Sequence, residues 1–93
     1  MTAQPYRFTA PVPRDPVLHE LLPLRLYDQS IAICLSVRLA DDGAWRARLR
    51  FIDPDERTRE TAEIFCGTSE AELWQSVHNL GQHHLRALYL SLA

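Results

Sequence analysis

Hydrophobic residues alternate with small or polar residues along two segments in the middle of the chain. The first segment spans residues 31–40, and its hydrophobic positions are Ile31, Ile33, Leu35, Val37 and Leu39. The second spans residues 45–51, where Trp45, Ala47, Leu49 and Phe51 are separated by three arginines. A period of two residues predicts a pair of strands, each with one buried face. Asp41-Asp42-Gly43 between them is a hairpin signal, because glycine readily adopts the left-handed conformation that such a turn needs.

A weaker alternation over residues 58–66 predicts a third antiparallel strand, which follows a turn at Asp53-Pro54. In the register that we expect, Arg48 lies opposite Glu63 and Arg46 lies opposite Phe65. Ile64 and Cys66 then point toward the buried side of the sheet.

The C-terminal part of the chain has a helical pattern. Ser69-Glu70-Ala71-Glu72 is a capping-box sequence, in which Ser69 accepts from the Glu72 amide while the Glu72 side chain reaches back. Hydrophobic residues then recur on one face up to about Leu90, which predicts one long helix.

The N-terminal part is less regular. Four prolines within the first sixteen residues predict an extended or disordered arm over residues 1–14, followed by a single domain over residues 15–93. Asp15-Pro16 is typical of a helix start, so we expect a short helix over residues 16–22. Leu22, Leu24 and Leu26 also alternate, and an extended piece over residues 23–28 would add a fourth strand.

These elements predict an α+β fold with two layers. A meander of three strands, or of four if residues 23–28 pair, forms the sheet, and the long C-terminal helix covers one of its faces. The short N-terminal helix precedes the sheet.

Composition restricts the classes of function. The 93 residues carry ten arginines, no lysine and twelve acidic residues, for a net charge of −2. This balance disfavours a strongly basic nucleic-acid module and a polybasic membrane binder. No hydrophobic run reaches the length of a membrane-spanning helix. Two cysteines without a secretion signal predict free thiols and a cytoplasmic location.

The sequence offers no catalytic residues, no metal site and no cofactor site. On the predicted strands Cys34 and Cys66 lie on opposite faces, and Cys66 is separated from His84 by most of the helix. His78, His83 and His84 lack the spacing of four residues that places two imidazoles on one helical face. Glycines are too sparse for a phosphate-binding loop.

His84 is the one histidine in the hydrophobic stripe of the predicted helix, one turn after Gly81. Its position leaves two interpretations open. It is either a buried histidine beside a packing glycine, or a partly wet histidine at an interface.

The predicted face of the sheet away from the helix gathers most of the candidate interaction residues, which are Arg38, Arg46, Arg48, Arg50, Arg59 and Phe65. Guanidinium groups in a row bind carboxylates or phosphates, and they also occur on any solvated sheet face. Our leading hypothesis is a small non-catalytic domain that binds proteins and associates with itself as a homodimer. The alternative is binding of nucleic acid or another anion through the arginines of this face.

Overall fold

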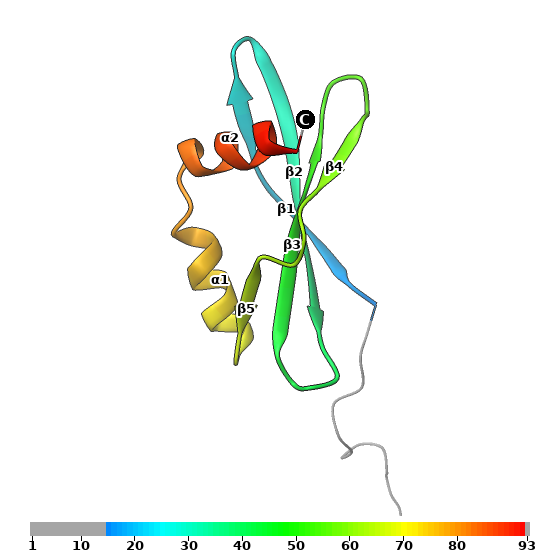
Figure 1. Ribbon diagram of the computed structural model, residues 1–93, viewed down its shortest axis with the longest axis vertical. Coiled ribbons are helices and arrows are strands. Elements are labelled where there is room, and N and C mark those ends of the chain that lie inside the picture. The colour runs from blue at the N-terminus through cyan, green and yellow to red at the C-terminus, as the bar shows by residue number, and fades with distance from the viewer. Residues whose placement is uncertain (1–14, 93) are drawn as a thin grey trace, which may run out of the picture.

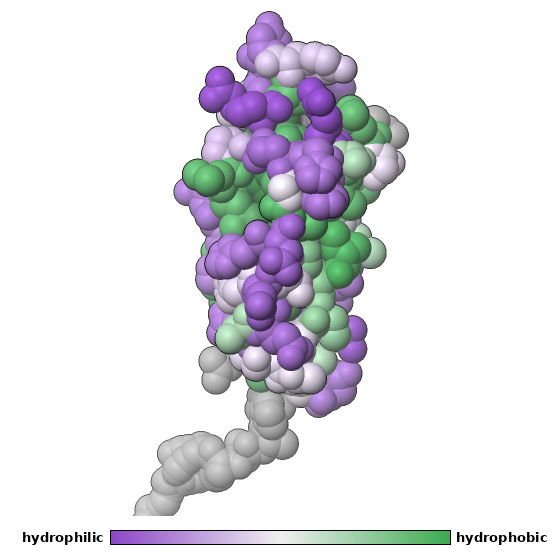
Figure 2. All heavy atoms as spheres, turned by 90° about the vertical axis from the view of Figure 1, so that its left-hand side faces the viewer, coloured by the Kyte–Doolittle hydropathy of each residue, from purple (hydrophilic) through white to green (hydrophobic). Residues whose placement is uncertain are grey.

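The computed structural model describes residues 15–92, and the predicted N-terminal arm lies outside this range. An antiparallel sheet carries two helices on the same side (Figure 1). The surface on the side of the helices mixes hydrophilic and hydrophobic regions (Figure 2). In chain order the elements are β1 (Val17–Leu26), β2 (Gln29–Leu39), β3 (Trp45–Ile52), β4 (Thr58–Glu60), β5 (Phe65–Gly67), α1 (Glu70–His78) and α2 (Gln82–Ser91). The predicted α+β class and antiparallel meander are confirmed.

The central hairpin has the predicted form. β2 lies between β1 and β3, and Leu35 is paired with Leu49 while Arg38 is paired with Arg46. Gly43 in the connecting turn has φ +85°, the left-handed conformation that the sequence predicts there. The alternation places one side of β2 and β3 in the core, where the fully buried side chains include Ile31, Ile33, Leu35, Leu49 and Phe51.

The predicted short helix over residues 16–22 is wrong, because β1 begins at Val17 and pairs with β2 along its length. The strand prediction for residues 23–28 is right in part, since β1 runs through Leu26. A register shift between Leu21 and Leu24 takes Pro23 out of the regular ladder. Proline is tolerated at such an irregularity because it has no amide hydrogen to contribute.

The predicted third strand is divided into β4 and β5, which both pair with β3. Arg50 is paired with Glu60, and further along β3 Arg46 is paired with Cys66. The predicted register is therefore out by one residue at both strands, and a slip of one residue exchanges the faces of all side chains. For this reason Phe65 is buried, whereas Ile64 is 46% exposed.

The predicted long helix is also divided, with a break between His78 and Gln82. Asn79 is the C-cap of α1, and Gly81 is the extended N-cap residue of α2, with φ −96° and ψ 172°. Glycine is a poor residue for a helix interior, so a break there costs little. At the start of α1, Ser69 accepts from the Glu72 amide as predicted, but the Glu72 carboxylate accepts from Thr68.

Candidate functional site

The open face of the sheet, opposite the helices, carries four of the six predicted interaction residues. Arg38 on β2 and Arg46, Arg48 and Arg50 on β3 all project there, because they alternate with buried residues. All four side chains are about one third exposed, at 34% to 41%. The sequence pattern thus placed this row correctly.

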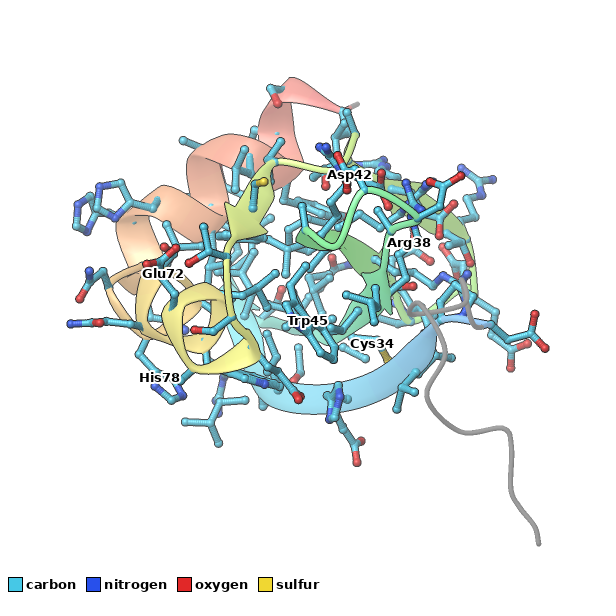
Figure 3. All side chains as sticks on the ribbon, turned by 90° about the horizontal axis from the view of Figure 1, so that it is seen from below. Cys34, Arg38, Asp42, Trp45, Glu72 and His78 are labelled. Carbon is cyan, nitrogen blue, oxygen red and sulfur yellow. The ribbon has the colours of Figure 1, made fainter. Side chains whose placement is uncertain are left out.

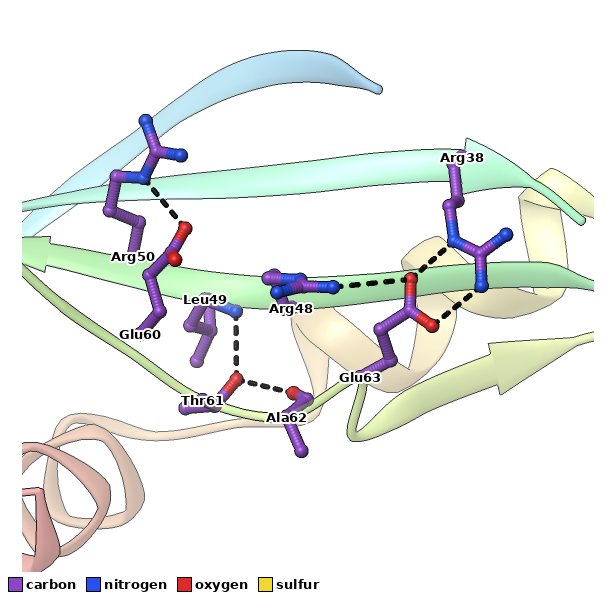
Figure 4. A network of polar contacts seen from close by, with 8 residues as sticks. All are labelled: Arg38, Arg48, Leu49, Arg50, Glu60, Thr61, Ala62 and Glu63. Carbon is purple, nitrogen blue, oxygen red and sulfur yellow. Dashed lines mark hydrogen bonds and ion pairs between the residues drawn. The ribbon is translucent and has the colours of Figure 1, made fainter. Parts of the chain in front are cut away.

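Carboxylates lie beside each of these arginines (Figure 4 shows three of the four). Arg38 donates two hydrogen bonds to Glu63, at 2.5 and 2.8 Å, and Arg48 lies 3.9 Å from the same carboxylate. Arg50 donates to Glu60 at 2.9 Å. Arg46 donates to Asp42 in the hairpin turn at 3.0 Å. An incoming anion would have to displace these partners, so the row is a poor anion site.

The proton affinities agree with this pairing. The hydrogen bond from Arg38 holds the pKa of Glu63 below its ordinary value, and the same bond raises the pKa of Arg38. The Asp42 pKa is lowered first by a hydrogen bond from the Ala44 amide and then by Arg46. These carboxylates therefore stay ionised and neutralise the row well below neutral pH.

Thr61 lies in the connection between β4 and β5, next to Glu60 and two residues before Glu63, and it binds this connection to β3. Its hydroxyl accepts from the Leu49 amide at 3.0 Å and donates to the Ala62 carbonyl at 2.6 Å (Figure 4). Its own amide donates to the Leu49 carbonyl. Thr61 is 6% exposed, so these bonds are shielded from water. They fix the chain between β4 and β5.

The other two predicted residues of the face lie on the opposite side of the sheet. Phe65 is opposite Ala47 in the core and is 6% exposed. Arg59 is opposite Phe51, and its guanidinium lies 4.5 Å from the centre of the Tyr89 ring of α2. Both were placed on the wrong face by the predicted register of the third strand.

His84 is exposed, so the first of its two interpretations, a buried histidine beside a packing glycine, is wrong. The helix break removes it from the hydrophobic stripe and makes it the third residue of α2. Its Nδ1 accepts a hydrogen bond from the Gly81 amide at 3.2 Å, which satisfies one amide at the helix start. The structure describes one chain, so an interface role for His84 stays a prediction.

Both cysteines are free thiols, as predicted, but they share the open face instead of lying on opposite faces. Cys34 is opposite Arg50 and Cys66 is opposite Arg46. Four residues of strand separate these positions on β3, or roughly 13 Å, which exceeds the reach of a disulfide.

A pocket of about 350 Å³ lies at the end of the sheet on the helix side, and no pattern in the sequence indicates it. Trp45 forms part of its wall, and Figure 3 shows this side chain between α1 and β1. Val17 of β1 and Glu70 at the start of α1 also line it. His19 lines it too and packs edge-on against Trp74 of α1, with ring centres 4.9 Å apart. The pocket joins residues that are distant in the sequence, so no local pattern could predict it.

Comparisons with models of protein families, with curated proteins and with solved structures gave no match for this chain. Within residues 15–92, no three His, Cys, Asp or Glu side chains are grouped closely enough to hold a metal ion. No helix in that range is long and apolar enough to span a bilayer.

Proposed function

We propose that this chain is a small non-catalytic protein-interaction domain that self-associates through the first half of β1, residues 17–21. The observation that carries the proposal is the position of β1 at the edge of the sheet together with its exposed hydrophobic side chains. Among residues 15–92, three of the six exposed large hydrophobic residues lie on or beside this segment: Val17, Leu18 and Leu22.

An edge strand with exposed hydrophobic residues is a template for another strand. The second half of β1 is less accessible, because Pro23 and the register shift interrupt it and Gln82 of α2 accepts from the Arg25 amide at 3.4 Å. The first half of β1 pairs with β2 along one edge, and its other edge has no neighbouring strand in the described part of the chain. Val17, at its start, lines the same pocket as Trp45. A partner strand would therefore bind along residues 17–21.

A second copy of the chain suits this segment better than an arbitrary strand. If two copies pair antiparallel about His19, Leu18 lies opposite Glu20 of the second copy, and Val17 lies opposite its Leu21. The like charges on the two copies of Glu20 then do not face each other, and hydrophobic residues meet on the pocket side. A homodimer with a continuous sheet follows.

Binding of nucleic acid or another anion through the open sheet face is not favoured. Each arginine in the row already has a carboxylate within 4 Å. We keep a cytoplasmic location as part of the proposal, since the two cysteines lie too far apart to form a disulfide within one chain.

Sedimentation equilibrium on the full chain tests the proposal. We expect a dimer for the wild type and a monomer for Leu18→Glu, which sets a carboxylate opposite Glu20 of the second copy. Leu18→Arg should keep the dimer, because it creates an opposite-charge pair across the strands. Leu90→Glu, at a site that is also about half exposed, is the matched control and should stay dimeric.

A monomeric wild type at the highest soluble concentration would overturn self-association. A dimer that survives Leu18→Glu as well as Leu90→Glu would place the interface elsewhere and would overturn the assignment to β1.

A further inference from the structure

A second pocket, of about 300 Å³, lies where α2 meets the end of β1. Its lining residues are Arg25 from β1 and Gln82, His83 and Arg86 from α2. The hydrogen bond between the Arg25 amide and the Gln82 side chain joins the two elements at 3.4 Å. Two arginines and one histidine from two elements therefore line one concavity.

The charge of this cationic pocket is not compensated. Among the ion pairs between described residues, none involves Arg25 or Arg86. The first turn of α2 contains no acidic residue, whereas α1 begins with Glu70 and Glu72. The nearest acid in the sequence is Asp28, in the turn after β1. The pocket is thus lined by hydrogen-bond donors that can bind an anion, and no acidic side chain is among the described residues that line it.

Aromatic rings lie beside two of these donors, Arg86 and His83. The Arg86 guanidinium lies 5.9 Å from the centre of the Tyr27 ring, at the edge of cation–π range. The centres of the His83 and His84 rings lie 3.9 Å apart with their planes tilted by 38°, and the His84 Nδ1 accepts a hydrogen bond from the Gly81 amide. Arg25, His83 and Arg86 are exposed residues, so a ligand from solution can reach all three.

We propose that the cationic pocket binds a small phosphate monoester. Two arginines, an imidazole and an amide offer more donors than the two oxygens of a carboxylate can use, whereas a phosphate dianion presents three charged oxygens. Each guanidinium can contact two of these oxygens in its planar geometry. The ligand is thus a phosphorylated small molecule or inorganic phosphate, and this inference does not depend on how the chain self-associates.

Two-dimensional ¹H–¹⁵N NMR of the full chain at low salt provides the test, with inorganic phosphate, ribose 5-phosphate and acetate as separate ligands. We expect saturable shifts at residues 25–28 and 81–86 for both phosphates, and at least tenfold weaker binding of acetate. A tighter complex with ribose 5-phosphate than with inorganic phosphate would identify a monoester as the preferred source of the phosphate group.

Arg86→Gln and Arg25→Gln should each weaken phosphate binding by about tenfold or more, because each removes a charged donor. Arg50→Gln is the matched control: it removes the same charge from the open sheet face and should change the affinity by less than twofold. An equal loss in Arg50→Gln would mean nonspecific attraction to net charge and would overturn the site, as would the absence of saturable shifts. The Leu18→Glu variant should bind phosphate normally, which separates this result from the outcome for self-association.

Discussion

The arginines of the open sheet face are half-buried and those of the cationic pocket are exposed, and the two sets also differ in their surroundings. On the sheet face, an acid from the hairpin turn, from β4 or from the β4–β5 connection lies beside each guanidinium, and Glu63 lies beside two of them. In the cationic pocket, Arg25 and Arg86 have no carboxylate within ion-pair distance among the described residues. The more conspicuous row in the sequence is thus the neutralised one, and the less conspicuous pair is the better candidate for an anion.

The two helix starts show the same contrast. α1 begins with Ser69 as its cap and with Glu70 and Glu72, which complement the positive end of the helix dipole. α2 begins with Gly81 and continues with Gln82 and two histidines. A helix start without acidic residues leaves its amide groups available to an external anion, and here it adjoins Arg25 and Arg86.

The largest effect that we expect in the sheet-face region comes from Thr61→Val. This change removes a buried hydroxyl that accepts from the Leu49 amide, and it leaves that amide unsatisfied. The free energy of unfolding should fall by about 1–3 kcal/mol, as measured by urea denaturation. The connection that sets Glu60 and Glu63 beside the arginines should loosen with it.

Thr58→Val is the control for this change, since Thr58 is an exposed threonine in β4. It should change stability by no more than about 0.5 kcal/mol. Equal effects at the two sites would contradict the role of Thr61 in holding the carboxylates on the sheet face.

A smaller effect is expected for Glu63→Gln, which leaves Arg38 and Arg48 without their shared carboxylate. Because the pair is partly exposed, the loss at neutral pH should be about 0.5–1 kcal/mol. The folded-state pKa of Glu63 is lowered, so its contribution is complete above the ordinary value of 4.5 and disappears as the pH falls through the folded value.

Urea denaturation at several pH values measures this dependence. The wild type should be more stable than Glu63→Gln at neutral pH, and the difference should shrink as the solution is acidified below pH 4.5. A constant difference over the whole range would mean that the ion pair is not its source.

The sequence is sufficient to predict an element where one face of that element is buried and its hydrophobic pattern is regular. β2, β3 and their hairpin follow from the alternation of Ile31, Ile33 and Leu35 and from Gly43. It was insufficient where tertiary contacts decide between two local patterns. Val17 and Leu18 suit a helix as well as a strand, and pairing with β2 selects the strand.

Of the two candidate sites, one can be predicted from the sequence and the other cannot. The row from Arg46 to Arg50 is visible because a strand repeats every two residues. The cationic pocket is not visible, because Arg25 and Arg86 are 61 residues apart and meet through the packing of α2 beside β1. The break at Gly81, which turns α2 toward β1, is also what removes His84 from the hydrophobic stripe.

The smallest effect that we expect concerns His84 and distinguishes its capping role from the predicted buried one. Its Nδ1 accepts from an exposed amide, so His84→Ala should lower the free energy of unfolding by about 0.5 kcal/mol. Glutamine at the same position can reach back to the N-cap amide, so His84→Gln should restore wild-type stability in the same urea measurement. If His84 instead filled a hydrophobic site in the core, glutamine would not rescue it, and both variants would lose more than 1 kcal/mol. Full stability in His84→Gln would therefore show that this histidine acts as a polar cap at the start of α2, the same helix end that adjoins Arg25 and Arg86.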